Sequence, residues 1–398
     1  MQSVYAIVVF NKEKKGKKLP KTVIINKESK NYLIQLYDDE SNKSIKSIKQ
    51  EIEKLKILIL KLNDKDVPIV TNCFRHLIDV LDLPLDMRRY NVYDMHITDP
   101  IYDVTSGERA IEHLKSCEIK PYQKVFANSS IVYADMERKG LLFNHSLVSP
   151  IWSQDTYSGR SKSTGFNIQG FSEKVFVHNV SALEGDLLVH FDWICADIRV
   201  ASLLSGDENL KRSFVKSDPY KFLMKNLNNL RSSKGLEEVF DRDECKLILL
   251  KGINSLDCGS IVFSDVYPEL GEWIKNVTSH DSAVTMMDRR FHITEDKTKL
   301  SVFNGVMQGS VAHAMQNVIR RVWEKLGNRL ICDIHDSIVL NVANDRVDIK
   351  SVINIVSEIM LDPFGDGQYF PLKISVGKKW REYSYLRTVY NPSELEVL

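Results

Sequence analysis

The stretch HFDWICADIRVASLLSGDENL, residues 190–210, decides the fold class of this chain. It closes a β-rich run, DLLVHFDW (186–193), and continues as ADIRVASLLS (196–205), whose apolar residues have helical spacing. Asp192 therefore stands at the end of a predicted strand that leads directly into a helix. Far downstream, RLICDIHDSIVLNV (329–342) reads as a tight β-hairpin with His335 and Asp336 at its turn.

The two aspartates can meet, because strand ends and hairpin tips of one sheet lie close in space. Two carboxylates so placed could hold two divalent ions about 4 Å apart, the arrangement that catalyses in-line phosphoryl transfer. Carboxylate oxygens suit Mg²⁺ in particular. Taken singly, Asp192 and Asp336 are better explained as turn-forming residues.

Two further groups of polar residues could bind phosphate or nucleic acid. Arg242 and Lys246 lie four residues apart in EVFDRDECKLILLKGIN (238–254), so a helix would place both cations on one face, with Leu250 a turn further on. The polar loop SGRSKSTGFNIQ (158–169) offers donors suited to phosphate oxygens and base edges. An exposed basic pair and an ordinary polar loop remain the alternatives. A hydrolase relay from His335-Asp336-Ser337 is excluded, since neighbouring strand residues point to opposite faces.

The composition sets only broad limits. The chain has 398 residues, is 43% hydrophobic and 27% charged, and carries a formal net charge of +1. These values are ordinary for a soluble protein of two or three domains, and they exclude a histone-like DNA-binding protein. Six scattered cysteines without a CxxC pair argue against a zinc site. With no signal-peptide pattern and no apolar run near the roughly 20 residues that span a bilayer, we expect a soluble intracellular protein without membrane contact.

The order of the sequence blocks resembles family A DNA polymerases, the bacterial DNA polymerase I group, over about residues 150–380. Residues 190–210 resemble the first polymerase motif of that family, and ICDIHDSIVL (331–340) resembles the third. Between and around them lie four further similar blocks: SGRSKSTGFNIQ (158–169), RDECKLILL (242–250), VFNGVMQGSVAHAM (302–315) and FPLKISVGKKW (370–380).

The resemblance implies roles residue by residue. Asp192 and Asp336 match the two metal-binding aspartates, and the backbone carbonyl of Trp193 is expected to face a metal. The implied nucleotide-binding residues are Arg242, Lys246, Asp197, His335 and Leu250. The implied DNA contacts are Arg160, Asn167, Gln169, Gln308 and Arg289. The implied cofactor is a pair of Mg²⁺ ions, for which Mn²⁺ is expected to substitute.

Several positions depart from the family pattern. Leu250 replaces an aromatic residue, Asn254-Ser255 stands in place of a Tyr-Gly pair, and Ser337 replaces a Glu. Asp197 stands where the family keeps a Glu against the sugar 2′ position, so we expect looser rejection of ribonucleotides.

Two departures concern the architecture. IVYADMERKGLLFN (131–144) lies almost directly before SGR, so the long helical thumb is expected to be missing or reduced. In the N-terminal part, PIVTNCFRHLIDVL (68–81) faintly resembles an exonuclease block, but Arg75 stands where a metal-binding Asp is expected and FNKE (10–13) is the nearest match to Asp-x-Glu. We therefore expect an exonuclease-like domain without hydrolytic activity; an unrelated α/β domain is the alternative.

The predicted fold is an α+β polymerase right hand, with an antiparallel palm sheet, helical fingers and a reduced thumb, preceded by a small α/β RNase H-like domain. The predicted domains are 1–112, exonuclease-like, and 113–398, the polymerase, with its palm at about 140–204 and 300–398 and its fingers at about 205–299.

The predicted function is template-directed DNA synthesis from a primer 3′ end without proofreading. A single-subunit RNA polymerase or primase-like enzyme is one alternative, because that group also has His-Asp-Ser in its third motif. A catalytically inactive accessory subunit is another. The expected partners are DNA primer-template, dNTPs and a processivity or replisome partner that compensates for the reduced thumb. The expected setting is the cytoplasm of a bacterium or an infected host cell, as for a phage-like enzyme.

Overall fold

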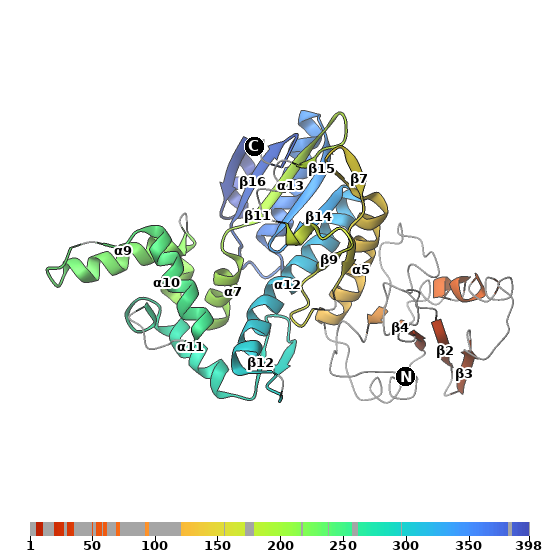
Figure 1. The fold of residues 1–398 in the computed structure, drawn as a ribbon, viewed down its shortest axis with the longest axis horizontal. Coiled ribbons are helices and arrows are strands. Elements are labelled where there is room, and N and C mark those ends of the chain that lie inside the picture. Colours follow the sequence, from red (N-terminus) through yellow and green to blue (C-terminus); the bar gives the residue numbers. More distant parts are fainter. Residues whose placement is uncertain are drawn as a thin grey trace. The chain divides into compact units, whose positions relative to one another are not determined.

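The computed structural model describes residues 5–10, 20–27, 30–35, 50, 53–57, 59–61, 69–71, 92–94, 121–154, 156–171, 179–215, 218–237, 239–256, 262–295, 297–380 and 384–397. The chain forms two compact units, Met1–Gly140 with Val148–Tyr157 and Ser161–Gly170, and Leu141–Leu147 with Ser158–Arg160 and Phe171–Leu398. Each unit is described by itself (Figure 1). The predicted domain boundary at 112/113 stays a prediction.

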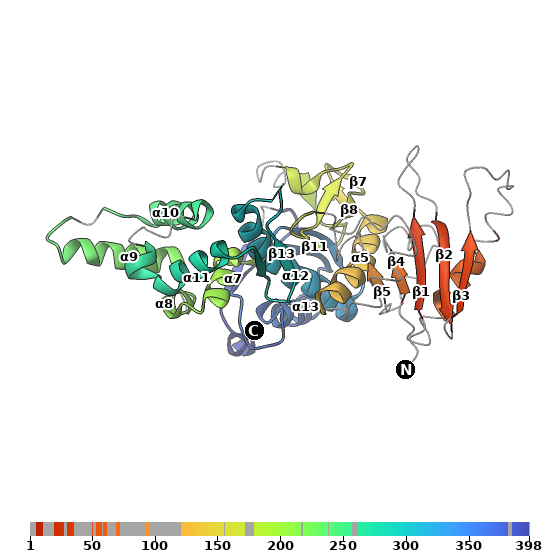
Figure 2. The same ribbon diagram turned by 90° about the horizontal axis from the view of Figure 1, so that it is seen from below.

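A five-stranded mixed sheet forms the N-terminal part of the first unit, and Figure 2 shows β1, β2 and β3 side by side. Its strand order is β3-β2-β1-β4-β5. β1 pairs antiparallel with β2 and parallel with β4, which places an antiparallel meander beside a parallel pair. The bounds are β1 Tyr5–Phe10, β2 Pro20–Lys27, β3 Lys30–Gln35, β4 Ile69–Thr71 and β5 Val92–Asp94. Arg75 and residues 11–13, on which the exonuclease comparison depends, lie outside the described residues.

The rest of the first unit is built on one long helix, α5 (Pro121–Lys139). It packs against a short hairpin of β8 (Ile151–Ser153) and β9 (Lys162–Thr164), followed by a 3₁₀ turn at Ile168–Gly170. The side chain of Gln154 closes this contact, since its Nε2 donates to Ser129 Oγ at 2.7 Å and its Oε1 accepts from Ser130 Oγ at 2.8 Å. These buried polar groups are therefore satisfied across the helix and hairpin.

An antiparallel sheet of order β14-β15-β11-β16-β17 forms the centre of the second unit. Its central strand, β11, is apolar on most of its length because both of its edges are paired and its faces are covered. The bounds are β11 Asp186–Trp193, β14 Leu330–Ile334, β15 Ser337–Ala343, β16 Leu372–Gly377 and β17 Ser384–Val389. A smaller sheet of order β10-β6-β7 comprises β6 Leu141–Phe143, β7 Ser146–Val148 and β10 Val180–Ser181. The larger sheet matches the predicted palm.

Two helices pack on each other and on this sheet, α12 (Lys299–Leu326) and α13 (Arg346–Leu361). α13 contacts β11, β15 and β16, and the indole nitrogen of Trp193 donates to the carbonyl of Met360 at 2.9 Å. This bond fixes the end of β11, next to Asp192, against the buried C-terminal turn of α13. The 3₁₀ segment Pro392–Val397 follows β17 and also contacts α13.

The remaining helices of the second unit gather away from the sheet (Figure 1). They are α7 Ala196–Ser205, α8 Glu208–Ser213, α9 Pro219–Ser232, α10 Arg242–Ser255 and α11 Pro268–Ser279, with a π-helical turn at Val262–Val266 and a hairpin of β12 Ser282–Val284 and β13 Arg290–His292. Gly206, in the left-handed region, ends α7, and the carboxylate of Asp207 caps α8. The second oxygen of Asp207 accepts from Leu270 N at 3.1 Å, which joins α8 to α11.

Phe263 packs α10 against α11 through two glycines. A Cβ on Gly252 would lie 2.6 Å from the Phe263 ring, and one on Gly271 would lie 2.8 Å from Phe263 Cβ. Each helix thus lies so close to Phe263 that a Cβ at its glycine would force a shift.

The predicted elements of the second unit are confirmed. DLLVHFDW, ADIRVASLLS and the His335-Asp336 hairpin occur at the predicted positions. In the first unit, residues 53–57 and 59–61 are helical, with Leu55 and Ile59 buried. In the described part of the chain, no helix combines the length and the apolar character that crossing a bilayer requires.

Candidate active site

The backbone brings Asp192 and Asp336 to adjacent strand ends. β11 pairs with β15 so that Asp192 stands opposite Ser337, one residue beyond Asp336. At the end of this ladder, the amide of Trp193 donates to the carbonyl of Asp336 at 3.2 Å. Asp192 and Asp336, 144 positions apart in the sequence, therefore stand at neighbouring strand ends of one sheet.

Asp336 lies in a two-residue turn, because Ile334 and Ser337 are paired on its two sides. His335, the first turn residue, has a left-handed φ of 58°, as two-residue hairpin turns require. The hydroxyl of Ser337 donates to the carbonyl of Ile334 at 3.1 Å and closes the turn. The tight turn leaves His335 exposed at the tip and Asp336 half-buried beside β11.

Trp193 contributes its backbone to this edge. In a strand, the N–H and C=O of one residue point to the same neighbour, so the Trp193 carbonyl points to the side of Asp336. A role of the Trp193 carbonyl as a metal ligand stays a prediction.

The site contains several charged side chains, and their opposite charges only partly offset one another. Burial, and after it the nearby carboxylate of Asp197, raise the pKa of Asp336 to about 6 against the lowering effect of Arg160. Arg160 itself is held by Asp197, with its Nη2 at 3.1 Å from Oδ1. Partial burial and Arg160 lower the pKa of His335, while Asp197 raises it. Four predicted residues therefore share one electrostatic environment.

The donor set fits a hard divalent cation. Asp192 and Asp336 offer carboxylate oxygens, Trp193 offers a carbonyl, and the raised pKa of Asp336 marks a buried negative charge that a cation would offset. Among the residues that the structure describes, no group of three or more His, Cys, Asp or Glu side chains could hold a metal ion. The coordination would therefore be completed by water and by phosphate oxygens of a substrate, as is usual for Mg²⁺.

Arg289 lies inside the protein rather than on its surface. It is 3% exposed, its Nη1 donates to the carbonyl of Ser158 at 2.9 Å, and its guanidinium lies 4.7 Å from the Phe291 ring centroid. Arg289 thereby fixes the backbone just before Arg160. A direct contact with DNA, as predicted for Arg289, would require a change of conformation.

The predicted phosphate-binding cations lie on one helix close to β11. Arg242, Lys246 and Leu250 follow at four-residue intervals in α10. Burial raises the pKa of the Cys195 thiol, three residues after Asp192, and the positive charges of Arg242 and Lys246 lower it. The two cations are therefore near the start of α7 and the end of β11.

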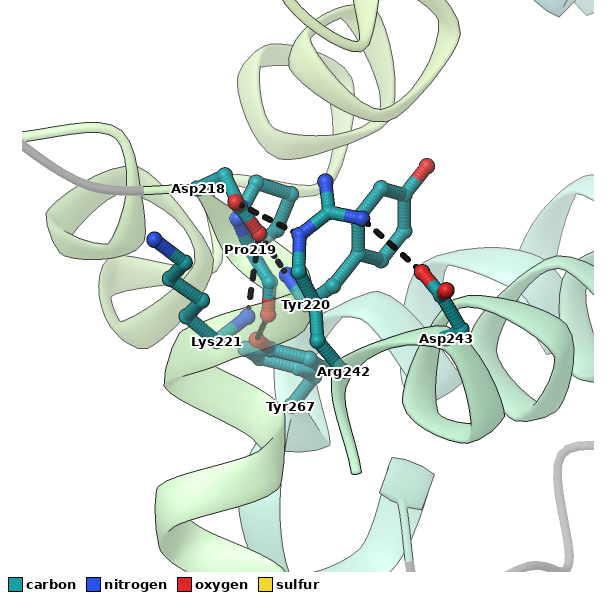
Figure 3. A network of polar contacts seen from close by, with 7 residues as sticks. All are labelled: Asp218, Pro219, Tyr220, Lys221, Arg242, Asp243 and Tyr267. Atoms are coloured by element: carbon teal, nitrogen blue, oxygen red, sulfur yellow. Dashed lines mark hydrogen bonds and ion pairs between the residues drawn. The ribbon is translucent and has the colours of Figure 1, made fainter. Parts of the chain in front are cut away.

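Arg242 is also in contact with carboxylates, which Figure 3 shows. Its Nε donates to Asp218 Oδ2 at 3.0 Å and its Nη1 to Asp243 Oδ1 at 3.2 Å. Asp241 and Glu244 cap the same end of α10. Arg242, which is predicted to bind the triphosphate, thus lies among acidic side chains. The sequence spacing of Arg242 and Lys246 did not indicate these neighbours.

The other predicted DNA contacts lie on two elements. Gln308 is half-buried on α12, and the following Gly309 lets α12 approach Phe291, since a Cβ there would lie 3.2 Å from its ring. Asn167 and Gln169 belong to the first unit and brace their own loop. Gln169 Nε2 donates to Ser161 Oγ at 2.9 Å, and Asn167 Oδ1 accepts from Gly170 N at 3.0 Å.

Three residues next to the candidate site are not predicted from the sequence. Lys373 is the cross-strand partner of Asp192 on β16, and the alternation of PLKIS could have placed it there. Asp218 and Tyr220 lie next to Arg242; Asp218-Pro219 has the form of a helix N-cap followed by Pro at the first helical position, a detectable signal.

The antiparallel sheet with its paired aspartates, and the separate helical group with its cationic helix, form a right-hand polymerase fold. No protein-family model matches the sequence. Among solved structures, the POL domain of Pol1 from M. smegmatis, in complex with DNA primer-template and dNTP, matches with a TM-score of 0.66 and 12% identity, over 95% of each chain.

Curated relatives point the same way. The thermostable DNA polymerase I of Thermus filiformis is 22% identical over 324 residues, and that of Thermus thermophilus is 23% identical over 322 residues. Each match covers 71% of this chain and 36% of the relative, so the matched region spans about a third of these relatives. The predicted resemblance to the DNA polymerase I group and the predicted fold class are confirmed.

Proposed function

We propose that this chain is a template-directed DNA polymerase that adds deoxynucleotides to a primer 3′ end. The observation that carries the proposal is the hydrogen bond between Trp193 N and Asp336 O, which sets two carboxylates at neighbouring strand ends. The similar proteins are DNA polymerases, and the solved structure contains primer-template and dNTP. DNA primer-template and dNTPs are therefore the proposed partners.

The proposed chemistry uses two divalent ions, Mg²⁺ or Mn²⁺, held by Asp192, Asp336 and the Trp193 carbonyl. When bound, such ions polarise phosphoryl oxygens and stabilise the attacking and leaving oxygens of an in-line transfer. The protein's own part is to hold the carboxylates on a rigid sheet and to bind the triphosphate with Arg242 and Lys246. Arg160 and Asp197 would lie next to the nucleotide sugar, beside His335.

Further parts of the proposal concern the whole protein. The absence of proofreading rests on the sequence of the N-terminal part, where Arg75 stands in place of a metal-binding Asp. The proposal of a reduced thumb rests on the short stretch of sequence between the end of α5 and the SGR loop. A processivity partner and a place in the cytoplasm of a bacterium or infected host cell complete the proposal.

Primer extension tests the proposal through the two aspartates. We expect Asp192→Ala and Asp336→Ala each to lower the rate with Mg²⁺ by at least about a hundredfold, because each removes a ligand of the ions that stabilise charge in the transition state. Asp186→Asn is the matched control, since Asp186 lies at the opposite end of β11 and interacts with Asn341. Thermal melting shows that each variant is folded.

The same reaction with separate dNTPs and rNTPs distinguishes the alternatives. Extension with rNTPs in preference to dNTPs would favour an RNA polymerase or primase-like enzyme. A folded wild type that extends no primer would point to an accessory subunit. Wild-type activity that survives Asp336→Ala would remove the proposed active site.

A further inference from the structure

Asp218 makes two kinds of contact at once, in a part of the molecule that the proposed chemistry does not explain. Its Oδ1 caps α9 by accepting from Tyr220 N and Lys221 N, each at 3.0 Å. Its Oδ2 accepts from Arg242 Nε at 3.0 Å. Two backbone amides thus fix the carboxylate that directs the guanidinium of Arg242 (Figure 3).

Further contacts hold the residues around the Asp218–Arg242 pair in place. The Tyr267 hydroxyl donates to the Pro219 carbonyl at 3.0 Å, which ties the first turn of α9 to the residue before α11. The Tyr220 ring is buried, and its centroid lies 5.3 Å from the Arg242 guanidinium carbon. Ring and carboxylate together restrict the guanidinium, and the Asp218 side chain is only 16% exposed.

The second carboxylate on Arg242 is held differently. Asp243 lies next to Arg242 in sequence, contacts Nη1 at 3.2 Å, and has a side chain that is 86% exposed. An ion pair so exposed contributes little and is readily replaced. Among the described residues, no hydrogen bond to Nη2 is found, so displacing Asp243 makes both terminal nitrogens available.

We propose that Asp218 is a positioning residue for nucleotide binding: it holds Arg242 by Nε so that Nη1 and Nη2 can face a triphosphate, and Asp243 is the contact that the triphosphate displaces. The inference rests on the proposed function, and it assigns to α9 a part in substrate binding. Two parallel N–H groups match two phosphate oxygens, the pairing for which a guanidinium is suited. Asp218 leaves that edge open because it binds only the Nε side.

The test compares three Asp→Asn variants. Asn caps a helix about as well as Asp, so Asp218→Asn keeps the cap of α9 and removes the charge that holds Arg242. Asp243→Asn removes the displaceable contact. Asp345→Asn is the matched control, because Asp345 caps α13 through Val347 N and Asp348 N and has no ion pair among the described residues.

Steady-state nucleotide addition and thermal melting are measured for each variant. We expect Asp218→Asn to raise the KM for dNTP about tenfold with kcat changed less than about threefold, as for the loss of one charge-assisted contact. Asp243→Asn is expected to lower KM or leave it unchanged, and Asp345→Asn to leave both constants unchanged. All three variants are expected to melt near the wild type.

An unchanged KM in Asp218→Asn would overturn the inference. A lowered KM would also overturn it, because Asp218 would then compete with the triphosphate. Binding of inorganic tripolyphosphate to the wild type, Asp218→Asn and Arg242→Gln needs no polymerisation. If the wild type extends no primer, the proposed function fails, and weaker tripolyphosphate binding by Asp218→Asn still supports the inference while equal binding overturns it.

Discussion

At the scale of single residues, the ionised carboxylate of Asp336 lowers the stability of the folded protein. Its carboxyl is half-buried beside Asp197, and its pKa is raised to about 6 from an ordinary value of 3.8. Arg160, the nearby cation, is already paired with Asp197. The ionised Asp336 is therefore stabilised by little in the protein itself, which is typical of sites that bind a cation or a proton.

This cost predicts a pH-dependent difference between wild type and Asp336→Asn in EDTA. Well below the ordinary pKa of 3.8 the carboxyl is protonated in both the folded and the unfolded state and costs nothing. As pH rises from about 4 to about 6, the unfolded state loses this proton before the folded state does, so wild-type stability falls, and by pH 7 the Asn variant should be more stable by roughly 2–3 kcal/mol. Thermal melting at a series of pH values measures the difference.

The magnesium arm of that experiment supplies its control. Saturating Mg²⁺ should stabilise the wild type above pH 6 and leave Asp336→Asn nearly unchanged, because metal binding requires the deprotonated carboxylate. Equal melting temperatures of wild type and variant at pH 7 in EDTA would contradict the burial cost.

At the scale of elements, the position of α10 depends on Phe263 between Gly252 and Gly271. Gly252→Ala would ordinarily favour a helix, but the new Cβ would meet the Phe263 ring at 2.6 Å. We expect a net loss of about 1–2 kcal/mol in the free energy of unfolding, because overpacking outweighs helix propensity. Chemical denaturation measures this loss.

Lys251→Ala is the control for that variant, since Lys251 is the exposed neighbour on the same helix. It should be neutral within about 0.5 kcal/mol. A stabilised Gly252→Ala would mean that Phe263 moves aside freely and that the spacing of α10 and α11 is not fixed by glycine.

The sequence predicts the elements that depend on neighbouring residues, but it does not predict contacts between residues far apart in the chain. The strand before Asp192 and the hairpin at Asp336 follow from local periodicity, and β11 and β15 pair as the positions suggested. The pairs Arg160–Asp197 and Arg242–Asp218 join residues 37 and 24 positions apart, and only the packed fold selects those partners. The family resemblance implies a DNA contact for Arg289, yet its side chain is buried, and a charged residue carries no local signal of burial in the sequence.

At the scale of the whole molecule, the proposed reduction of the thumb rests on the short stretch of sequence between α5 and the SGR loop. A thumb holds duplex by backbone contacts, whose contribution depends strongly on salt. We expect the pure protein to add few nucleotides per binding event near physiological salt. Single-encounter primer extension with excess trap DNA measures the product length.

A salt series completes this prediction. Product length should rise markedly between about 200 mM and 50 mM salt, as phosphate contacts strengthen. Long products at physiological salt from the pure protein would contradict the reduced thumb, and a partner that restores them would support its replacement.

The bond between Trp193 N and Asp336 O joins main chain to main chain, so the spacing of the two aspartates is set without any side chain. The backbone pairing of β11 and β15 can therefore keep Asp192 and Asp336 together while the identities of neighbouring residues change in evolution. Lys373, a cross-strand partner of Asp192, can therefore be replaced without separating the pair. A centre built in this way tolerates large sequence change, in keeping with a shared fold at 12% identity.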